Sequence, residues 1–337
     1  MLWVIVVHVL YWGYFFGLGR VRLLQSFLLF EMPLFFFVTG ASNGFSATKG
    51  YFNFVFKRYK RILVPYWVFA AICACISIVF YKGNLDAPLI TKIALSWFIP
   101  VDRQISSVSY LSAALWFVPV YLCVVLAIPL LKRAKASKNA IFFFFTLVIL
   151  FFATCAANLG WIKNVAFYSI WTYVGLYYND FVRRLNQKGF RWKIALVSLT
   201  GAVAVVALHA LGVPLDMQLN KFPPNIAFGF FSMASTPVVL LNLRYIDKAF
   251  ALAEKNALTK KMADLFSTRS MTIFLYQSFA FKISVPLAYM LVPGSGFFES
   301  ALRAIFCFVA TVPLCALFAS VFGRIEAAAP KVLLFRE

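Results

Sequence analysis

Stretches of about twenty apolar residues recur along the whole chain, separated by short polar segments. A helix of about twenty residues crosses the hydrocarbon core of a bilayer and makes its backbone hydrogen bonds internally. The weakly alternating segments of a membrane β-barrel are absent. The sequence therefore predicts an all-α, polytopic membrane protein, with one membrane domain over residues 1–337. We expect about ten transmembrane helices, at residues 2–19, 27–45, 62–81, 111–131, 140–158, 164–180, 194–212, 224–243, 271–291 and 298–322.

Composition and charge agree with this interpretation. Hydrophobic residues make up 63% of the chain and charged residues 13%, against about a quarter charged in soluble domains. The net charge of +21 does not indicate nucleic acid, because the basic residues lie between the apolar spans. The segments expected in the cytoplasm carry 23 Lys and Arg and the outer segments carry seven, which predicts both termini in the cytoplasm. The expected location is the cell membrane, inner or plasma, in contact with its lipids.

Two polar segments are long enough to hold helices of their own. The outer segment 82–110 contains an apolar run at residues 89–100, which is too short to span and predicts an interfacial or re-entrant helix. The inner segment 244–270 mixes acidic residues with lysines and predicts a short solvated helix.

Metal chemistry is not expected. The six cysteines lie inside apolar spans, no pair has CxxC spacing, and the chain has only two histidines. We interpret the cysteines as small packing residues.

His8 is the single ionisable side chain of the first predicted span. At ~1.5 Å of rise per residue it would lie roughly 10 Å below the cytoplasmic edge, where ionisable groups face a cavity or a partner. An imidazole, with an ordinary pKa of about 6.5, is suited to accept a proton from a hydroxyl nucleophile at neutral pH. The alternative is a neutral core histidine bonded to a carbonyl or a tyrosine. For His209, near the outer end of the seventh span, we prefer that alternative.

A basic run meets the start of the third span. It has five positive charges and no negative charge, from Lys49, Lys57, Arg58, Lys60 and Arg61. Arg58 and Arg61 are three residues apart and project from one face of a helix, where guanidinium groups match phosphate oxygens. A polyanionic ligand is one interpretation, and simple attraction to anionic lipid headgroups is the other. Pro65 and Tyr66 follow at once.

Small and polar residues interrupt the second span near its cytoplasmic end. Gly40, Asn43 and Gly44 predict either a local break that lines a cavity or a close approach of helices. Asn43 is the better functional candidate of the three.

Three further charges lie within or beside apolar spans. Glu31 and Arg303 lie near the outer ends of the second and tenth spans. By forming an ion pair they would lower the free-energy cost of burying both charges; alternatively, their charged ends would extend to the interface. Lys282, near the middle of the ninth span, is too deep for its amino group to reach the interface easily, which indicates a functional site or a partner.

An ordered set of local sequences completes the sequence evidence. After His8 come MPLFFFVTG (32–40), KRYKRILVPY (57–66), LWFVPVYL (115–122), KFPPNIAF (221–228) and SMTIFLYQ (270–277). This set resembles the acyltransferase-3 family of membrane-bound O-acyltransferases. The resemblance implies a ten-helix domain that moves an acyl group, often acetyl, from cytoplasmic acyl-CoA (acetyl-CoA) to a hydroxyl of a carbohydrate, a lipid-linked glycan or a small molecule.

The resemblance also implies roles for particular residues. His8 matches the family's essential histidine, and Arg58 and Arg61 match its Arg-x-x-Arg motif. We predict His8 as the catalytic base. The predicted donor-binding residues are Lys57, Arg58, Arg61 and Tyr66, and the predicted acceptor-binding residues are Glu31, Asn43, Trp116, Lys282 and Arg303. The expected partners are acyl-CoA and a hydroxyl-bearing acceptor; a homo-oligomer and glycan-assembly proteins stay open as further partners.

The chain departs from the family pattern at several positions. An arginine that usually precedes the histidine would fall before Met1, so we expect the natural start to lie upstream. Glu31 and Gln277 stand where many relatives carry histidine or another polar group. We expect no esterase-like domain of the kind that some relatives carry after the membrane domain.

Two rival functions remain. A transporter or flippase for a lipid-linked or anionic substrate would bind its substrate without releasing CoA, and the sequence lacks the symmetry-related broken helices typical of many transporters. A purely structural membrane subunit would leave His8 and the arginine pair without a role.

Overall fold

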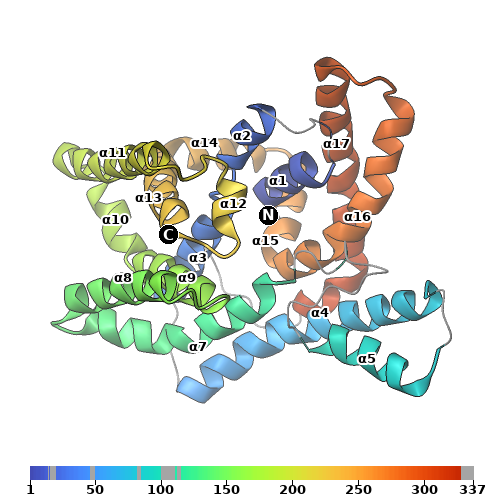
Figure 1. Ribbon diagram of the computed structural model, residues 1–337, viewed down its shortest axis with the longest axis horizontal. Coiled ribbons are helices and arrows are strands. Elements are labelled where there is room, and N and C mark those ends of the chain that lie inside the picture. The colour runs from blue at the N-terminus through green and yellow to red at the C-terminus, as the bar shows by residue number, and fades with distance from the viewer. Residues whose placement is uncertain are drawn as a thin grey trace. The chain divides into compact units, whose positions relative to one another are not determined.

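The computed structural model describes residues 1–13, 15, 20–45, 50–81, 85–99, 111 and 115–327. Within these residues the regular elements are helices, together with one bridge between Lys221 and Pro224 (Figure 1). The predicted all-α class is therefore confirmed. The chain forms two compact units. Unit 1 holds the described residues of Met1–Phe16, Phe52–Leu122 and Ala257–Lys331, and unit 2 holds those of Gly17–Tyr51 and Cys123–Asn256.

Unit 1 is built on a pair of long helices. Its helices are α1 (Leu2–Trp12), nearly all of α4 (Tyr51–Val79), α5 (Ala87–Phe98), the start of α7 (Phe117–Ala136), α15 (Ala257–Thr268), α16 (Ser270–Leu291), α17 (Phe297–Phe322) and α18 (Arg324–Ala327). Helices α16 and α17 lie side by side (Figure 1), and α1 packs against both. Ile5 and Val9 of α1 enter a core with Phe281, Cys307 and Cys315. The buried cysteines are packing residues, as predicted.

Helix α4 carries the basic run into the membrane segment. It has 29 residues, which at ~1.5 Å per residue gives about 44 Å, longer than a hydrocarbon core of ~30 Å. The basic N-terminal part can therefore extend beyond the hydrocarbon while the rest crosses it. The C-terminal half of α4 is hydrogen-bonded to α5. The Tyr66 hydroxyl donates to the Trp97 carbonyl at 2.6 Å, and the Trp97 indole donates to Ser77 at 2.9 Å.

Unit 2 contains the remaining helices. They are α2 (Arg20–Ser26), α3 (Glu31–Gly44), most of α7, α8 (Ala140–Ala156), α9 (Ile162–Gly175), α10 (Tyr178–Arg184), α11 (Lys188–Ala210), α12 (Met217–Lys221), α13 (Ile226–Leu241) and α14 (Leu243–Ala253). Its closest helix pairs are α11 with α13 and α3 with α9. Gly201 lets α11 approach the backbone of α13, where Ser198 donates to the Ala234 carbonyl at 2.5 Å.

Helices α3 and α9 pack in parallel at a glycine contact. A Cβ atom on Gly40 would overlap the backbone of Thr172, and one on Gly175 would overlap the backbone of α3. One turn before this contact, Phe36 stacks on Tyr168 with ring centroids 4.3 Å apart. Both partners advance by four residues from one contact to the next, so the two helices point in the same direction. Close helix approach, one of the two predicted roles of Gly40, is what the structure shows.

Lysines from the end of α7 bind the C-terminal ends of both parallel helices. Lys132 donates to the carbonyl of Asn43 at 3.1 Å, and Lys135 donates to the carbonyl of Leu176 at 2.6 Å. The last carbonyls of a helix lack partners within it and attract positive charge. The lysines therefore stabilise the ends of α3 and α9 at one level.

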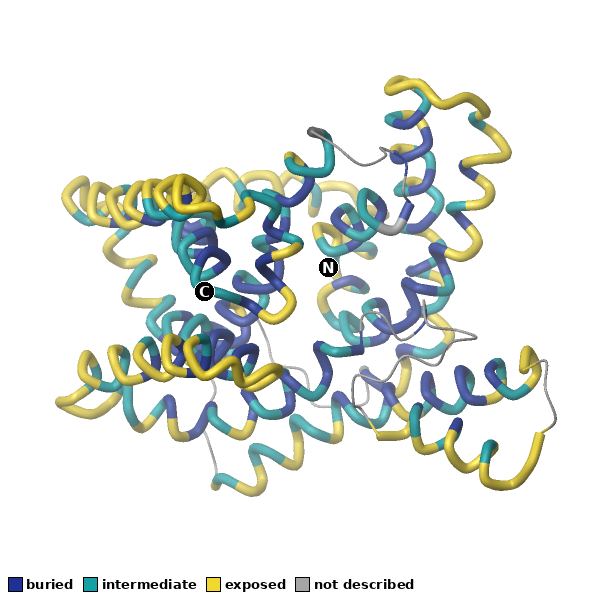
Figure 2. Tube along the Cα trace, viewed as in Figure 1, coloured by how far each residue is buried: buried dark blue, intermediate teal, exposed yellow. Residues whose placement is uncertain are grey.

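Six helical segments are long and apolar enough to cross a membrane. They are Val21–Gly44, Tyr51–Val79, Phe117–Ala136, Lys188–Ala210, Ser270–Leu291 and Phe297–Phe322. A seventh is obtained if the bent pair α13 and α14 counts as one span. Much of α8 and α11 is exposed (Figure 2), and the exposed residues include the large apolar Phe142, Trp192 and Val206, as expected of surfaces that contact lipid. The ten spans and the cytoplasmic termini stay predictions.

Several predicted boundaries differ from the observed ones. Helix α1 ends at Trp12 rather than at residue 19, although residues 16–19 lie outside the described part. The inner segment 244–270 holds two helices, α14 and α15, instead of one, because the chain turns between Glu254 and Asn256. The short helix expected at 89–100 is present as α5, two residues earlier. Lys49 of the basic run lies outside the described residues.

Candidate acyl-transfer site in unit 1

His8 lies on α1 against α16. Its Nδ1 atom is 3.1 Å from Oε1 of Gln277, and its ring meets the ring of Phe281 edge-on, with centroids 6.3 Å apart. Gln277 and Phe281 are four residues apart and so belong to the same face of α16. Ile5 and Val9, on either side of His8 along α1, are buried in the core, whereas His8 itself is partly exposed. The packing of α1 thus holds the imidazole at a fixed place on α16.

Arg58 and Arg61 lie on α4, three residues apart, as predicted. They are close enough for their charges to repel, and Arg58 also lies near the Tyr121 hydroxyl and over the ring of Phe54. Tyr59, between them, donates to the carbonyl of Leu122 at 3.0 Å. The start of α7 therefore fixes this stretch of α4, and both guanidinium groups remain partly exposed.

Glu326 of α18 caps the first turn of α16. Its buried carboxylate accepts hydrogen bonds from the backbone of Met271 at 3.0 Å and of Thr272 at 2.8 Å, and from the Thr272 hydroxyl at 2.9 Å. The positive charge of Arg61 is near enough to attract it. Burial raises the pKa of Glu326 above its ordinary value, and these hydrogen bonds and Arg61 partly oppose that rise.

His8 and Glu326 both contact α16, and the charge of Arg61 is near enough to attract Glu326. His8 contacts the helix at Gln277, and Glu326 contacts it at Thr272. The two α16 residues are five positions apart, which is about 7.5 Å along a helix axis. Unit 1 thus contains a cationic pair able to bind phosphate, on α4, and an imidazole able to accept a proton, on α1 against α16.

Glu31 has a different partner from the one predicted. In unit 2 it forms a buried ion pair with Lys221, and both side chains are about 95% removed from solvent, with exposed fractions of 4% for Glu31 and 5% for Lys221. Arg303, in unit 1, donates instead to the carbonyls of Val292 and Gly294 and stacks over Tyr289. The predicted pair of Glu31 with Arg303 is thus wrong, because each charge is satisfied within its own unit.

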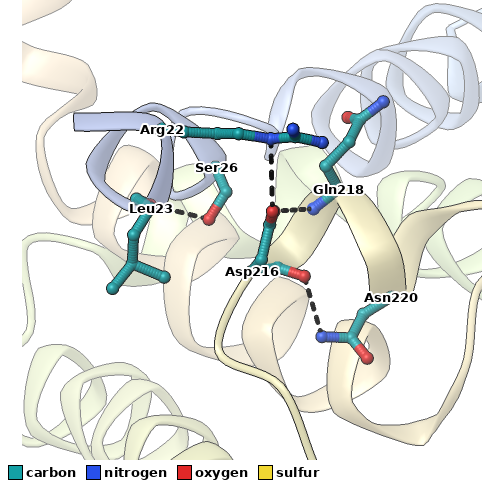
Figure 3. Close-up of polar contacts among 6 residues, drawn as sticks. All are labelled: Arg22, Leu23, Ser26, Asp216, Gln218 and Asn220. Carbon is teal, nitrogen blue, oxygen red and sulfur yellow. Dashed lines mark hydrogen bonds and ion pairs between the residues drawn. The ribbon is translucent and has the colours of Figure 1, made fainter. Parts of the chain in front are cut away.

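A polar cluster surrounds the short helix that carries Lys221 (Figure 3). The Asp216 carboxylate accepts from the backbone of Gln218 at 2.9 Å and forms an ion pair with Arg22 of α2 at 3.5 Å, and the Asp216 carbonyl accepts from Asn220 at 3.1 Å. Asn225 then donates to Asn220 at 2.7 Å and caps the start of α13. These bonds hold α2, α12 and α13 together, and they position Lys221 for Glu31.

The remaining predicted site residues lie in several places. Lys57 is exposed on α4, Lys282 is exposed on α16, and Trp116 is in the turn before α7. The buried Tyr66 hydroxyl bonds to α5, which gives it a structural contact. Asn43, buried in unit 2, donates its amide to the Thr39 carbonyl at 2.7 Å.

Comparison with known protein families matches residues 1–320 to the acyltransferase domain of the acyltransferase-3 family. The chain belongs to the acyltransferase-3 family. Together with its apolar helices, this makes the protein a multi-pass membrane acyltransferase. No curated protein and no solved structure matches the chain.

Sequence reasoning missed three residues of this acyltransferase that the structure brings forward. Lys221 was noted only within the sequence KFPPNIAF, Glu326 was not singled out, and Gln277 was noted as a departure but not as the partner of His8. The signal for Lys221 and Gln277 was present, since both lie within local sequences shared with the family. Among the described residues, no group of three or more His, Cys, Asp or Glu side chains is placed to hold a metal ion.

Proposed function

We propose that this acyltransferase moves an acetyl or other short acyl group from cytoplasmic acyl-CoA to a hydroxyl of a carbohydrate or lipid-linked glycan. The observation that carries the proposal is the set of groups in unit 1, where His8 contacts α16 at Gln277 and the charge of Arg61 is near enough to attract Glu326, which caps the same helix. Acyl transfer from acyl-CoA to a hydroxyl needs both groups. Cations bind the phosphates of CoA, and a base accepts the proton of the acceptor hydroxyl.

The proposed reaction uses each group once. Arg58 and Arg61 bind the CoA phosphates, and the thioester reaches inward toward His8. The acceptor hydroxyl gives its proton to the imidazole while its oxygen attacks the thioester carbonyl carbon. When the tetrahedral intermediate collapses, the carbon–sulfur bond breaks and the CoA thiolate leaves with the proton returned by His8. General-base catalysis of this kind contributes about 10²–10⁴ in rate.

The acceptor side of the proposal rests on fewer contacts. Asn43, predicted from the sequence as a donor to the oxyanion, stays a proposal; in the structure its amide donates to the Thr39 carbonyl. Glu31, Trp116, Lys282 and Arg303 stay proposals for acceptor binding, although the bonds of Arg303 to the turn after α16 favour a structural role.

Transfer by the purified protein tests the catalytic assignment. With acetyl-CoA as donor and a panel of hydroxyl-bearing glycans as acceptors, we expect His8→Ala to lower acceptor-dependent CoA release by about 10²–10⁴. The matched control is His209→Ala, because His209 is exposed at the end of α11 and bonds only locally, to the Val213 carbonyl at 3.0 Å. Wild-type turnover by a folded His8→Ala protein would show the assignment to be wrong, and acceptor binding without CoA release by the wild type would favour a transporter.

A second series tests the donor site. Arg58→Ala should raise the KM for acetyl-CoA by roughly tenfold or more, as expected for loss of a charged hydrogen bond of about 1.5–3 kcal/mol. Lys60→Ala, an exposed basic residue of the same run, is the control. Arg58 is a cleaner test than Arg61, whose charge also acts on Glu326. Equal KM values in Arg58→Ala and the control would contradict phosphate binding at this pair.

A further inference from the structure

We infer that Gln277 is a positioning residue that holds His8 in one tautomer, with the proton on Nδ1 and the lone pair on Nε2. The inference rests on the proposed role of His8 as base, and it adds which nitrogen acts and what selects it.

The orientation of the Gln277 amide is set by its own helix. Its Nε2 donates to the carbonyl of Phe274 at 2.9 Å, and a carbonyl only accepts hydrogen bonds. A flipped amide would place Oε1 against that carbonyl, so that two acceptors would face each other. The amide oxygen is therefore the atom that faces His8.

This orientation selects the tautomer of the imidazole. The contact at 3.1 Å joins Nδ1 of His8 to Oε1 of Gln277, which has no hydrogen to donate. Nδ1 must then carry the hydrogen, and in the neutral ring Nε2 is left as the basic nitrogen. In serine proteases, an amide in place of the orienting carboxylate lowers kcat about 10⁴-fold because it favours the wrong tautomer. Here the bond to Phe274 prevents that error.

Burial makes the selection firm. The Gln277 side chain is fully buried, so water does not compete for its oxygen. Phe281, one turn further along α16, meets the imidazole at an interplanar angle of 79° and limits its rotation. Since an amide carries no charge, it orients the ring without holding the protonated form, which suits a base that must release its proton to the departing thiolate.

A spectroscopic experiment tests the tautomer without reference to activity. The chain has two histidines, so His209→Ala leaves His8 as the only one. In that background, ¹⁵N-histidine labelling of the detergent-solubilised protein should show a neutral ring protonated at Nδ1, and Gln277→Leu should give a mixture of tautomers. A ring protonated at Nε2, or no change in Gln277→Leu, would overturn the inference.

Kinetics separate positioning from packing. Gln277→Leu should lower kcat by roughly 10- to 100-fold, as for the outer-shell partners of metal-bound histidines, with the KM for acetyl-CoA unchanged. Gln277→Glu restores an acceptor for Nδ1 but loses the donor to the Phe274 carbonyl, so it should recover part of kcat, with the acidic limb of the pH–rate profile moved to higher pH because the carboxylate stabilises the imidazolium. Ser278→Ala, which removes a local side-chain bond to the Leu275 carbonyl on the same helix, is the control.

The outcomes distinguish this inference from the proposed function. If His8→Ala is inactive while Gln277→Leu keeps the wild-type kcat and pH profile, the inference is wrong and the proposed function stands. If His8→Ala is active, the proposed function fails. Equal losses in Gln277→Leu and Gln277→Glu would mean that the position is needed only for packing, which also overturns the inference.

Discussion

Glu31 and Lys221 place two opposite charges almost completely out of solvent. Oε1 of Glu31 bonds to Lys221, whereas Oε2 has no hydrogen-bond partner among the described residues. Removing charges from water is costly, and mutual attraction repays that cost only while both partners are present. Removing either partner would therefore leave the other charge buried without compensation and destabilise unit 2.

Lys221→Met should destabilise the protein by about 3–5 kcal/mol, because it leaves an uncompensated carboxylate in the interior. The double variant Glu31→Met with Lys221→Met should recover most of that loss. Thermal unfolding of the detergent-solubilised protein, followed by tryptophan fluorescence, measures both. The matched control is Lys138→Met, at an exposed residue in the turn between α7 and α8, which should change little. A single variant as stable as the control would contradict a paired, desolvated Lys221.

Helix α18 acts on α16 through one carboxylate. The backbone N–H groups in the first turn of a helix have no partners within it, and Glu326 supplies two acceptors for them from another element. The short α18 thereby fixes the start of the helix that carries Gln277, five residues beyond Thr272. We expect changes at Glu326 to alter both stability and the geometry around His8.

Glu326 also predicts a pH dependence of stability. Its pKa is raised above the ordinary 4.5 in the folded protein, so the folded state binds the proton more strongly than the unfolded state. The corresponding stabilisation is complete below pH 4.5 and is lost as the pH rises through the folded pKa. Unfolding temperatures should therefore fall over this range in the wild type, and Glu326→Gln should flatten the fall. Glu254→Gln, at an exposed residue, is the control, and an unchanged slope in Glu326→Gln would contradict the prediction.

On the scale of the whole molecule, the sequence predicted the class of protein and the helices that carry the site. Apolar length located α4, α16 and α17, and a three-residue spacing placed Arg58 and Arg61 together, because both signals are local. The partner of Glu31 lies 190 positions away, and the partner of His8 lies 269 positions away. Such contacts depend on which helices pack together, and neither the hydrophobic periodicity nor the length of a segment determines its packing partner. The error over Arg303 has the same origin.

The parallel packing of α3 and α9 restricts how the chain can thread a bilayer. Two neighbouring helices that both cross in the same direction must be joined by an odd number of crossings. Between them, α4 and α7 have the length and apolarity of membrane helices, which makes two. Of the other described helices in that segment, α5 has 12 residues and α8 has 17, about 18 and 26 Å respectively. Helix α8 is therefore the helix expected to make the third crossing between α3 and α9.

Single cysteines before and after α8 test this count. In a variant without the native cysteines, Ser137→Cys and Leu159→Cys should react with a membrane-impermeant maleimide from opposite sides of sealed vesicles. Labelling of both from the same side would contradict a crossing by α8. If α3 and α9 both cross the membrane, as the sequence predicts, their shared direction requires a further crossing between them, and α8 can supply it where a locally thinned bilayer accommodates its length.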